Sequence, residues 1–100
     1  MGACDFHTYQ EGSDARKAFE AATDRARYMS GHGGYTGTIA EKSSFTVLKH
    51  TPMLKQDAQV FADSVIEKND KWGPAFAVPI ADEKEPTKTK GWYFFGFASS

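Results

Sequence analysis

Cysteine and histidine are the residue types of this chain that most often bind metals or act as nucleophile and base, and it contains Cys4, His7, His32 and His50. Recognisable metal sites combine such residues in motifs like Cys-x-x-Cys or His-Glu-x-x-His, and neither motif occurs here. On a strand, Cys4 and His7 would point to opposite faces, so they do not form a catalytic pair. The sequence therefore predicts no catalytic residue, no metal and no cofactor, and we expect the protein not to be an enzyme.

The segment 31–38 reads Gly-His-Gly-Gly-Tyr-Thr-Gly-Thr. Glycine loses more conformational entropy on folding than any other residue, so this glycine content implies that the segment needs backbone conformations that only glycine adopts readily. Its successive N–H groups could form a concave anion site, but phosphate loops open a helix, whereas this segment is expected to follow one. We therefore expect Gly31 to end a helix and the loop to contact a protein, with a small anionic ligand as the alternative. The candidate contact residues are His32, Gly33, Gly34, Tyr35 and Thr36.

A second candidate binding segment is the aromatic run 90–97, Lys-Gly-Trp-Tyr-Phe-Phe-Gly-Phe. It resembles the first RNP motif of RNA-recognition domains, in which exposed rings stack on bases. It departs from that motif because it follows the second expected helix, and because Tyr93 stands where the family has a small residue. Aromatic residues anchor protein interfaces, so we expect a protein-binding patch, with single-stranded nucleic acid as the alternative. The candidate residues of the patch are Trp92, Tyr93, Phe95 and Phe97.

The length and the charge of the chain limit the class of protein to which these two segments belong. One hundred residues fit a single domain over 1–100, and the net charge of −1 argues against a surface built to bind duplex nucleic acid. No apolar run is long enough to span a membrane, and a single cysteine excludes an internal disulfide. We therefore expect no membrane partner and a location in a reducing cytoplasm.

The elements that position the two segments follow from the spacing of apolar residues. The expected order is strand, helix, two strands, helix, two strands, whose first six elements match the ferredoxin-like pattern. We therefore expect an α+β fold with an antiparallel sheet, both helices on one face and an extra C-terminal strand at the edge. Pro79 cannot donate to a neighbouring strand, so its own strand is expected to be an edge or bulged strand. The expected strands are 4–9, 36–42, 45–50, 75–81 and 91–98, and the expected helices are 14–30 and 52–69.

The apolar composition predicts how the core is made. Thirteen alanines and eight phenylalanines accompany only two leucines, three isoleucines and four valines. Each aromatic ring buries on the order of 150–250 Å², so the rings can replace the missing aliphatic side chains. We expect large aromatic rings to pack against faces made of alanine.

The run from Ala18 to Tyr28, followed by 31–42 and Phe45, resembles small uncharacterised proteins encoded by phages and prophages. The likeness covers the first half of the chain and carries no established activity. It implies an accessory gene product that works in the cytoplasm of a bacterial host. With the aromatic patch, it suggests a protein that binds and inhibits or modulates a host or defence complex, and that could also form a homodimer.

Overall fold

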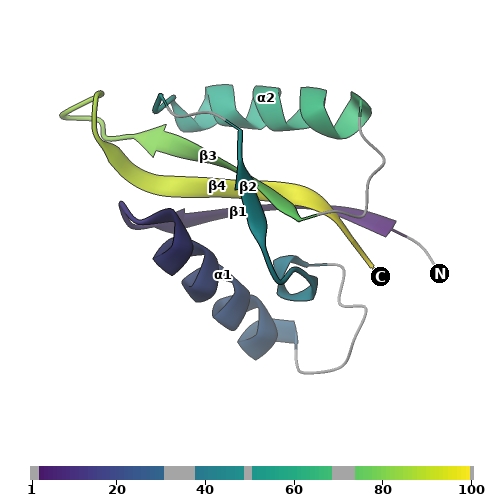
Figure 1. Cartoon of the computed structure of the whole chain (residues 1–100). Coiled ribbons are helices and arrows are strands. Elements are labelled where there is room, and N and C mark those ends of the chain that lie inside the picture. Colours follow the sequence, from purple (N-terminus) through teal and green to yellow (C-terminus); the bar gives the residue numbers. More distant parts are fainter. Residues whose placement is uncertain (1–2, 31–37, 49–50, 69–73, 100) are drawn as a thin grey trace.

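The computed structural model describes residues 3–30, 38–48, 51–68 and 74–99 (Figure 1). They form an α+β fold in which one four-stranded sheet has the strand order β1-β4-β3-β2. β4 is antiparallel to both of its neighbours, whereas β2 is parallel to β3. The elements are β1 (Ala3–Glu11), α1 (Ala15–Ser30), the 3₁₀ helix η1 (Ile39–Glu41), β2 (Phe45–Val47), α2 (Lys55–Lys68), β3 (Ala75–Ala81) and β4 (Thr89–Ser99).

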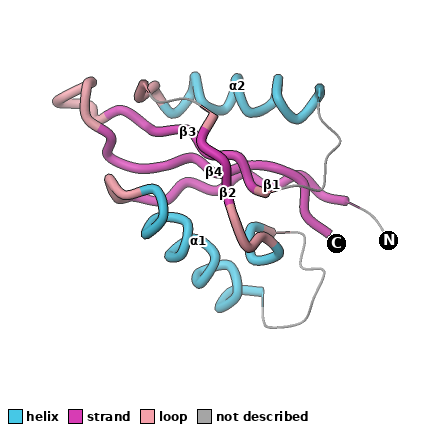
Figure 2. The backbone as a smooth tube through the Cα atoms, in the orientation of Figure 1, coloured by secondary structure: helices cyan, strands magenta, loops and turns pink. Residues whose placement is uncertain are grey.

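The two helices lie on opposite faces of the sheet, as Figures 1 and 2 show. The cause is β4, whose successive side chains alternate between two separate hydrophobic clusters. Phe94 and Ala98 belong to the cluster under α1, whereas Tyr93 and Phe95 belong to the cluster under α2. A strand that is apolar on both sides needs cover on both sides. The expectation of an antiparallel, ferredoxin-like sheet with both helices on one face and the last strand at the edge is therefore wrong.

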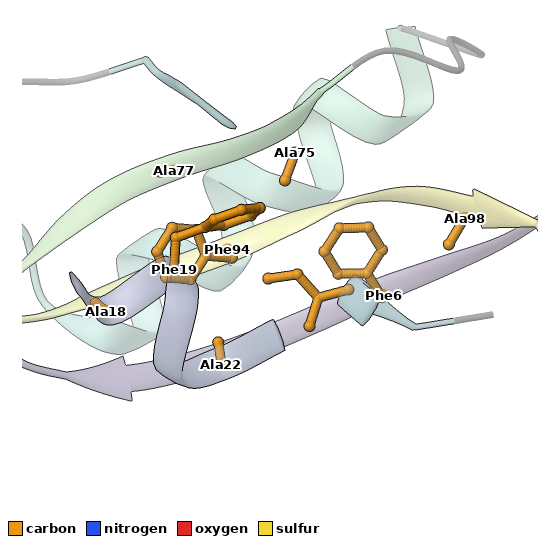
Figure 3. Packing of buried hydrophobic residues seen from close by; sticks show 9 residues of the cluster. Phe6, Ala18, Phe19, Ala22, Ala75, Ala77, Phe94 and Ala98 are labelled. Atoms are coloured by element: carbon orange, nitrogen blue, oxygen red, sulfur yellow. The ribbon is translucent and has the colours of Figure 1, made fainter. Parts of the chain in front are cut away.

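The cluster under α1 is a group of aromatic rings set among alanines (Figure 3). The ring of Phe19 lies 5.0 Å from that of Phe45 and 5.6 Å from that of Phe94, measured between centroids. Buried alanines of α1 and β3 leave the space that these rings fill, which confirms the expected packing of rings against alanine. These alanines are Ala18, Ala22, Ala75 and Ala77.

The cluster under α2 follows the same rule with different partners. Ala58 and Ala62 of α2 are fully buried and let the helix approach the sheet closely. The ring of Phe95 meets that of Phe61 edge-on, with 6.4 Å between centroids, and lies 5.6 Å from that of Phe76. β4 thus separates two cores, one for each helix.

The hairpin expected from 36–42 and 45–50 is wrong over its described part. Residues 36–37 and 49–50 lie outside the described residues, and Ile39–Glu41 is a 3₁₀ helix rather than a strand. The side-chain oxygen of Thr38 accepts a hydrogen bond from the backbone N–H of Ala40 at 3.2 Å. This local bond satisfies the N–H of Ala40 within a helix cap. Such side-chain bonds compete with strand pairing, and here the helical turn forms in place of a strand. β2 pairs with β3 instead.

Pro79 is tolerated inside β3 because of what lies beside it. β2 pairs only with Ala75–Ala77, so it ends before the proline. Beyond that point Met53 takes its place: its N–H donates to the carbonyl of Pro79 at 3.2 Å, and its carbonyl accepts from Ala81 at 2.8 Å. Among the described residues, no hydrogen bond to β3 on that side involves the position of the N–H that proline lacks. The strand is internal, and a register shift follows between Ile80 and Ala81.

Candidate functional site

Of the two candidate binding segments, the structure describes the aromatic run 90–97 but not residues 31–37 of the glycine-rich segment. His32, Gly33, Gly34, Tyr35 and Thr36 lie outside the described residues. In the aromatic segment, Tyr93 is 4% exposed and Phe95 is fully buried, both under α2. Their rings therefore do not form an exposed patch, and they are not available to stack on bases.

The other two aromatic residues, Trp92 and Phe97, are half-buried. Trp92 packs beside the cluster under α1, and its ring N–H donates to the carbonyl of Ser13 at 3.2 Å. β4 itself runs between β1 and β3, so it has no free edge. A second copy of the chain therefore cannot add a strand to β4.

The long free edge of the sheet belongs to β1. Within the described residues, β1 pairs only with β4, in an unbroken register from Ala3 opposite Ser99 to Glu11 opposite Gly91. The N–H of Gly12 continues this register, because it donates to the carbonyl of Lys90 at 2.9 Å. Hydrogen-bonded pairs alternate along antiparallel strands, so every second residue of β1 directs its N–H and C=O away from β4. The residues with outward backbone groups are Asp5, His7, Tyr9 and Glu11.

A polar cluster lies on the α2 side of this edge, around the imidazole of His7. Its Nδ1 lies 2.8 Å from the hydroxyl of Tyr93, and its Nε2 lies 3.2 Å from a carboxylate oxygen of Asp5. α2 adds Asp63, whose Oδ1 lies 3.9 Å from the same Nε2. One strand and one helix thus bring two carboxylates to one ring nitrogen, and a second strand brings a hydroxyl to the other.

The protonation of Tyr93 follows from burial. Removal from water raises the pKa of the Tyr93 phenol, and the negative charge of Asp63 adds to this rise. The phenol therefore keeps its proton to a higher pH than an exposed tyrosine does, and its oxygen is hydrogen-bonded to Nδ1 of His7.

The raised pKa of Tyr93 predicts a loss of stability at alkaline pH. The unfolded chain ionises at the ordinary tyrosine value of 10.0, below the pKa of the folded state. Above that pH the unfolded state binds fewer protons than the folded one, so the free energy of unfolding falls as pH rises. We expect Tyr93→Phe to flatten this fall between about pH 9 and pH 11. Thermal melts across the range measure it.

The Tyr93→Phe melts should keep part of the wild-type slope, because burial also raises the pKa of Tyr9. Equal slopes in the wild type and the Tyr93→Phe variant would contradict a desolvated phenol at position 93.

A cavity of about 320 Å³ lies at the C-terminal half of the same edge. Three consecutive residues of β1 line it, Tyr9, Gln10 and Glu11, together with Arg25 of α1. Consecutive strand residues point to opposite faces, so a cavity that touches all three lies along the strand edge. The side-chain oxygen of Gln10 is buried without a hydrogen-bond partner.

The sequence pointed to part of this site only. Alternation placed Asp5, His7 and Tyr9 on one strand face, but no spacing linked them to Asp63. Among the described residues, no three His, Cys, Asp or Glu side chains are grouped so that they could hold a metal ion. In the described ranges, no helix is both long enough and apolar enough to cross a membrane.

Comparisons with protein-family models, with curated proteins and with solved structures gave no match to this chain. The function is therefore inferred from the geometry of β1 and its surroundings.

Proposed function

We propose that this protein is a non-enzymatic binding domain whose β1 edge pairs with an extended strand of another protein. The observation that carries the proposal is the row of outward N–H and C=O groups along β1, from Asp5 to Glu11. Strand addition uses such groups for affinity, and it uses the side chains beside them for specificity.

The composition of β1 supports this use. Sheet edges that must stay unpaired are commonly protected by proline, by lysine or by a bulge. β1 has nine residues, contains neither proline nor lysine, and keeps an unbroken register with β4. The opposite edge, β2, has only three residues. β1 is therefore the edge with room for a partner strand.

The cavity along β1 supports the same conclusion. Tyr9, Gln10 and Glu11 line it together with Arg25, so a strand laid along β1 would pass it and could place a side chain there.

The class of partner comes from the resemblance of 31–42 to small phage and prophage proteins. On that basis the partner is a protein of the bacterial host, and binding inhibits or modulates the complex to which it belongs. The protein then acts in the host cytoplasm.

Two substitutions at one position test the role of the edge. His7→Ala and His7→Pro both remove the bond to Tyr93, which contributes about 1 kcal/mol to stability. Only His7→Pro also removes an outward N–H, which an edge strand can lose without unfolding. We expect His7→Pro to lose the proteins that the wild type captures from bacterial lysate while remaining folded by circular dichroism, and His7→Ala, which keeps the outward N–H, to retain more of this capture. Equal capture by both variants would contradict strand addition.

A further inference from the structure

We propose that the strand recognised by β1 carries a lysine or arginine side chain opposite Asp5 and His7. This inference rests on the proposed function, because it names the chemistry of the partner at the same edge. The cation would lie on the α2 side of the sheet, between the carboxylates of Asp5 and Asp63.

The carboxylates of Asp5 and Asp63 remain largely accessible to a partner. Their side chains are 57% and 71% exposed, although each approaches Nε2 of His7, at 3.2 Å for Asp5 and 3.9 Å for Asp63. Both carboxylates face the same ring nitrogen, which carries at most one N–H, so most of their acceptor positions face solvent. A cation in this place would therefore meet two negative charges with little competition from within the chain.

Strand pairing would bring a partner side chain to this place. Directly opposite residues on neighbouring strands have Cβ atoms about 4.5–5.5 Å apart, on the same face of the sheet. A residue opposite Asp5 or His7 would thus share the α2 side with both carboxylates. Lysine reaches them as a point charge, and the planar guanidinium of arginine can bind a carboxylate with two parallel hydrogen bonds.

The other charges along the edge confine this preference to the N-terminal half of β1. At the other half, the ammonium of Lys55 lies 4.4 Å from the centre of the Tyr9 ring, and Arg25 lines the cavity. A cation opposite Tyr9 would face Lys55, and only Glu11 would offset it. The partner strand is therefore expected to be basic at one end rather than along its length.

A second copy of the chain is a poorer occupant at neutral pH. Antiparallel pairing of β1 with itself about His7 would bring the two copies of Asp63 together beside the axis, because each lies 3.9 Å from its own His7. Like charges in such proximity oppose association. Each Asp5 would lie opposite Tyr9 of the other copy, near Lys55. Opposite His7, a second copy therefore offers another imidazole and carboxylate, whereas a basic strand offers a cation.

Two synthetic peptides test the inference directly. Both have the length of β1 and alternate threonine and valine. They differ only at two positions of one face near one end, which carry lysine in one peptide and glutamate in the other. Fluorescence anisotropy measures their binding to the intact chain at low and at physiological salt. We expect the lysine peptide to bind more tightly, with an advantage that shrinks as salt rises.

Two charge-neutralising variants of α2 locate the preference. Asp63→Asn removes a carboxylate beside His7, whereas Asp57→Asn removes an exposed charge from the same helix with no contact to β1 among the described interactions. We expect Asp63→Asn to weaken the lysine peptide about two- to five-fold, as for an exposed ion pair. Asp57→Asn should leave it unchanged.

The outcomes separate this inference from the proposed function. Equal binding of both peptides, or equal effects of the two variants, would overturn the basic partner and leave strand addition standing. Binding that survives in His7→Pro would place the peptide elsewhere and would overturn the inference. Failure of both peptides to bind a folded chain, or occupation of the edge by a second copy in sedimentation experiments, would overturn the proposed function itself.

Discussion

Replacement of Phe94 by alanine is expected to lower the free energy of unfolding by about 3–5 kcal/mol, the range for deleting a buried aromatic ring. Phe94 is fully buried at the centre of the sheet. Its ring meets those of Phe19 and Phe45 edge-on, with 5.6 and 5.8 Å between centroids. The alanines around it have no atoms with which to fill the space, so the cavity would persist. Urea denaturation followed by circular dichroism measures the change.

Two further substitutions act as controls for Phe94→Ala. Phe94→Leu keeps most of the volume, so we expect a loss of less than about 1.5–2 kcal/mol. Tyr28 is 87% exposed, and Tyr28→Ala should change stability by no more than about 0.5 kcal/mol. A small effect of Phe94→Ala, similar to that of Tyr28→Ala, would show that the ring is not part of a packed core.

Replacement of Gly96 by alanine is expected to lower the free energy of unfolding by about 1–3 kcal/mol. Gly96 has φ of +154°, in a region that residues with a Cβ rarely adopt. An added Cβ would lie 3.4 Å from the ring of Phe6, which covers this glycine from β1, and this is an ordinary van der Waals distance. Backbone strain therefore acts against the substitution. Thermal and urea denaturation measure the loss.

Gly91 provides a matched comparison within the same strand. Its added Cβ would approach the end of the Tyr9 ring, which is half-buried and can swing aside. Its φ lies outside the range that disfavours side chains. We therefore expect Gly91→Ala to lose less stability than Gly96→Ala. The reverse order would show that crowding by the ring, and not the backbone of Gly96, governs these positions.

Element positions were predictable because they depend on local periodicity. The strand expected at 75–81 matches β3, and the helices expected at 14–30 and 52–69 differ from α1 and α2 by no more than three residues at either end. The arrangement of the helices was not predicted, because the apolar residues on both faces of β4 were not recognised as a sign that both faces are covered. Rings that alternate on both sides, as Phe94 and Phe95 do, are typical of a strand covered on both faces. The prediction of an exposed patch that includes Tyr93 and Phe95 is therefore wrong for these two residues.

The candidate site was less predictable, for a related reason. The pairing of His7 with Tyr93 and its approach to Asp63 depend on the sheet order and on the face chosen by α2. Neither is encoded in spacing along the chain. The sequence did show an alternating polar and aromatic face on the first strand. Recognition of that strand as a free edge required the position of β4.

The pairing of β1 with β4 has a consequence for how the protein is made. β1 leaves the ribosome first, and its partner follows roughly 80 or more residues later, which takes about 4–20 seconds at ordinary rates of synthesis. Throughout that interval β1 lacks the neighbour that covers its inner edge and the ring of Phe6. Contacts between such distant residues form slowly, so the sheet closes late in folding. Until it closes, the unpaired strand and the uncovered ring of Phe6 are the surfaces most prone to associate with other chains.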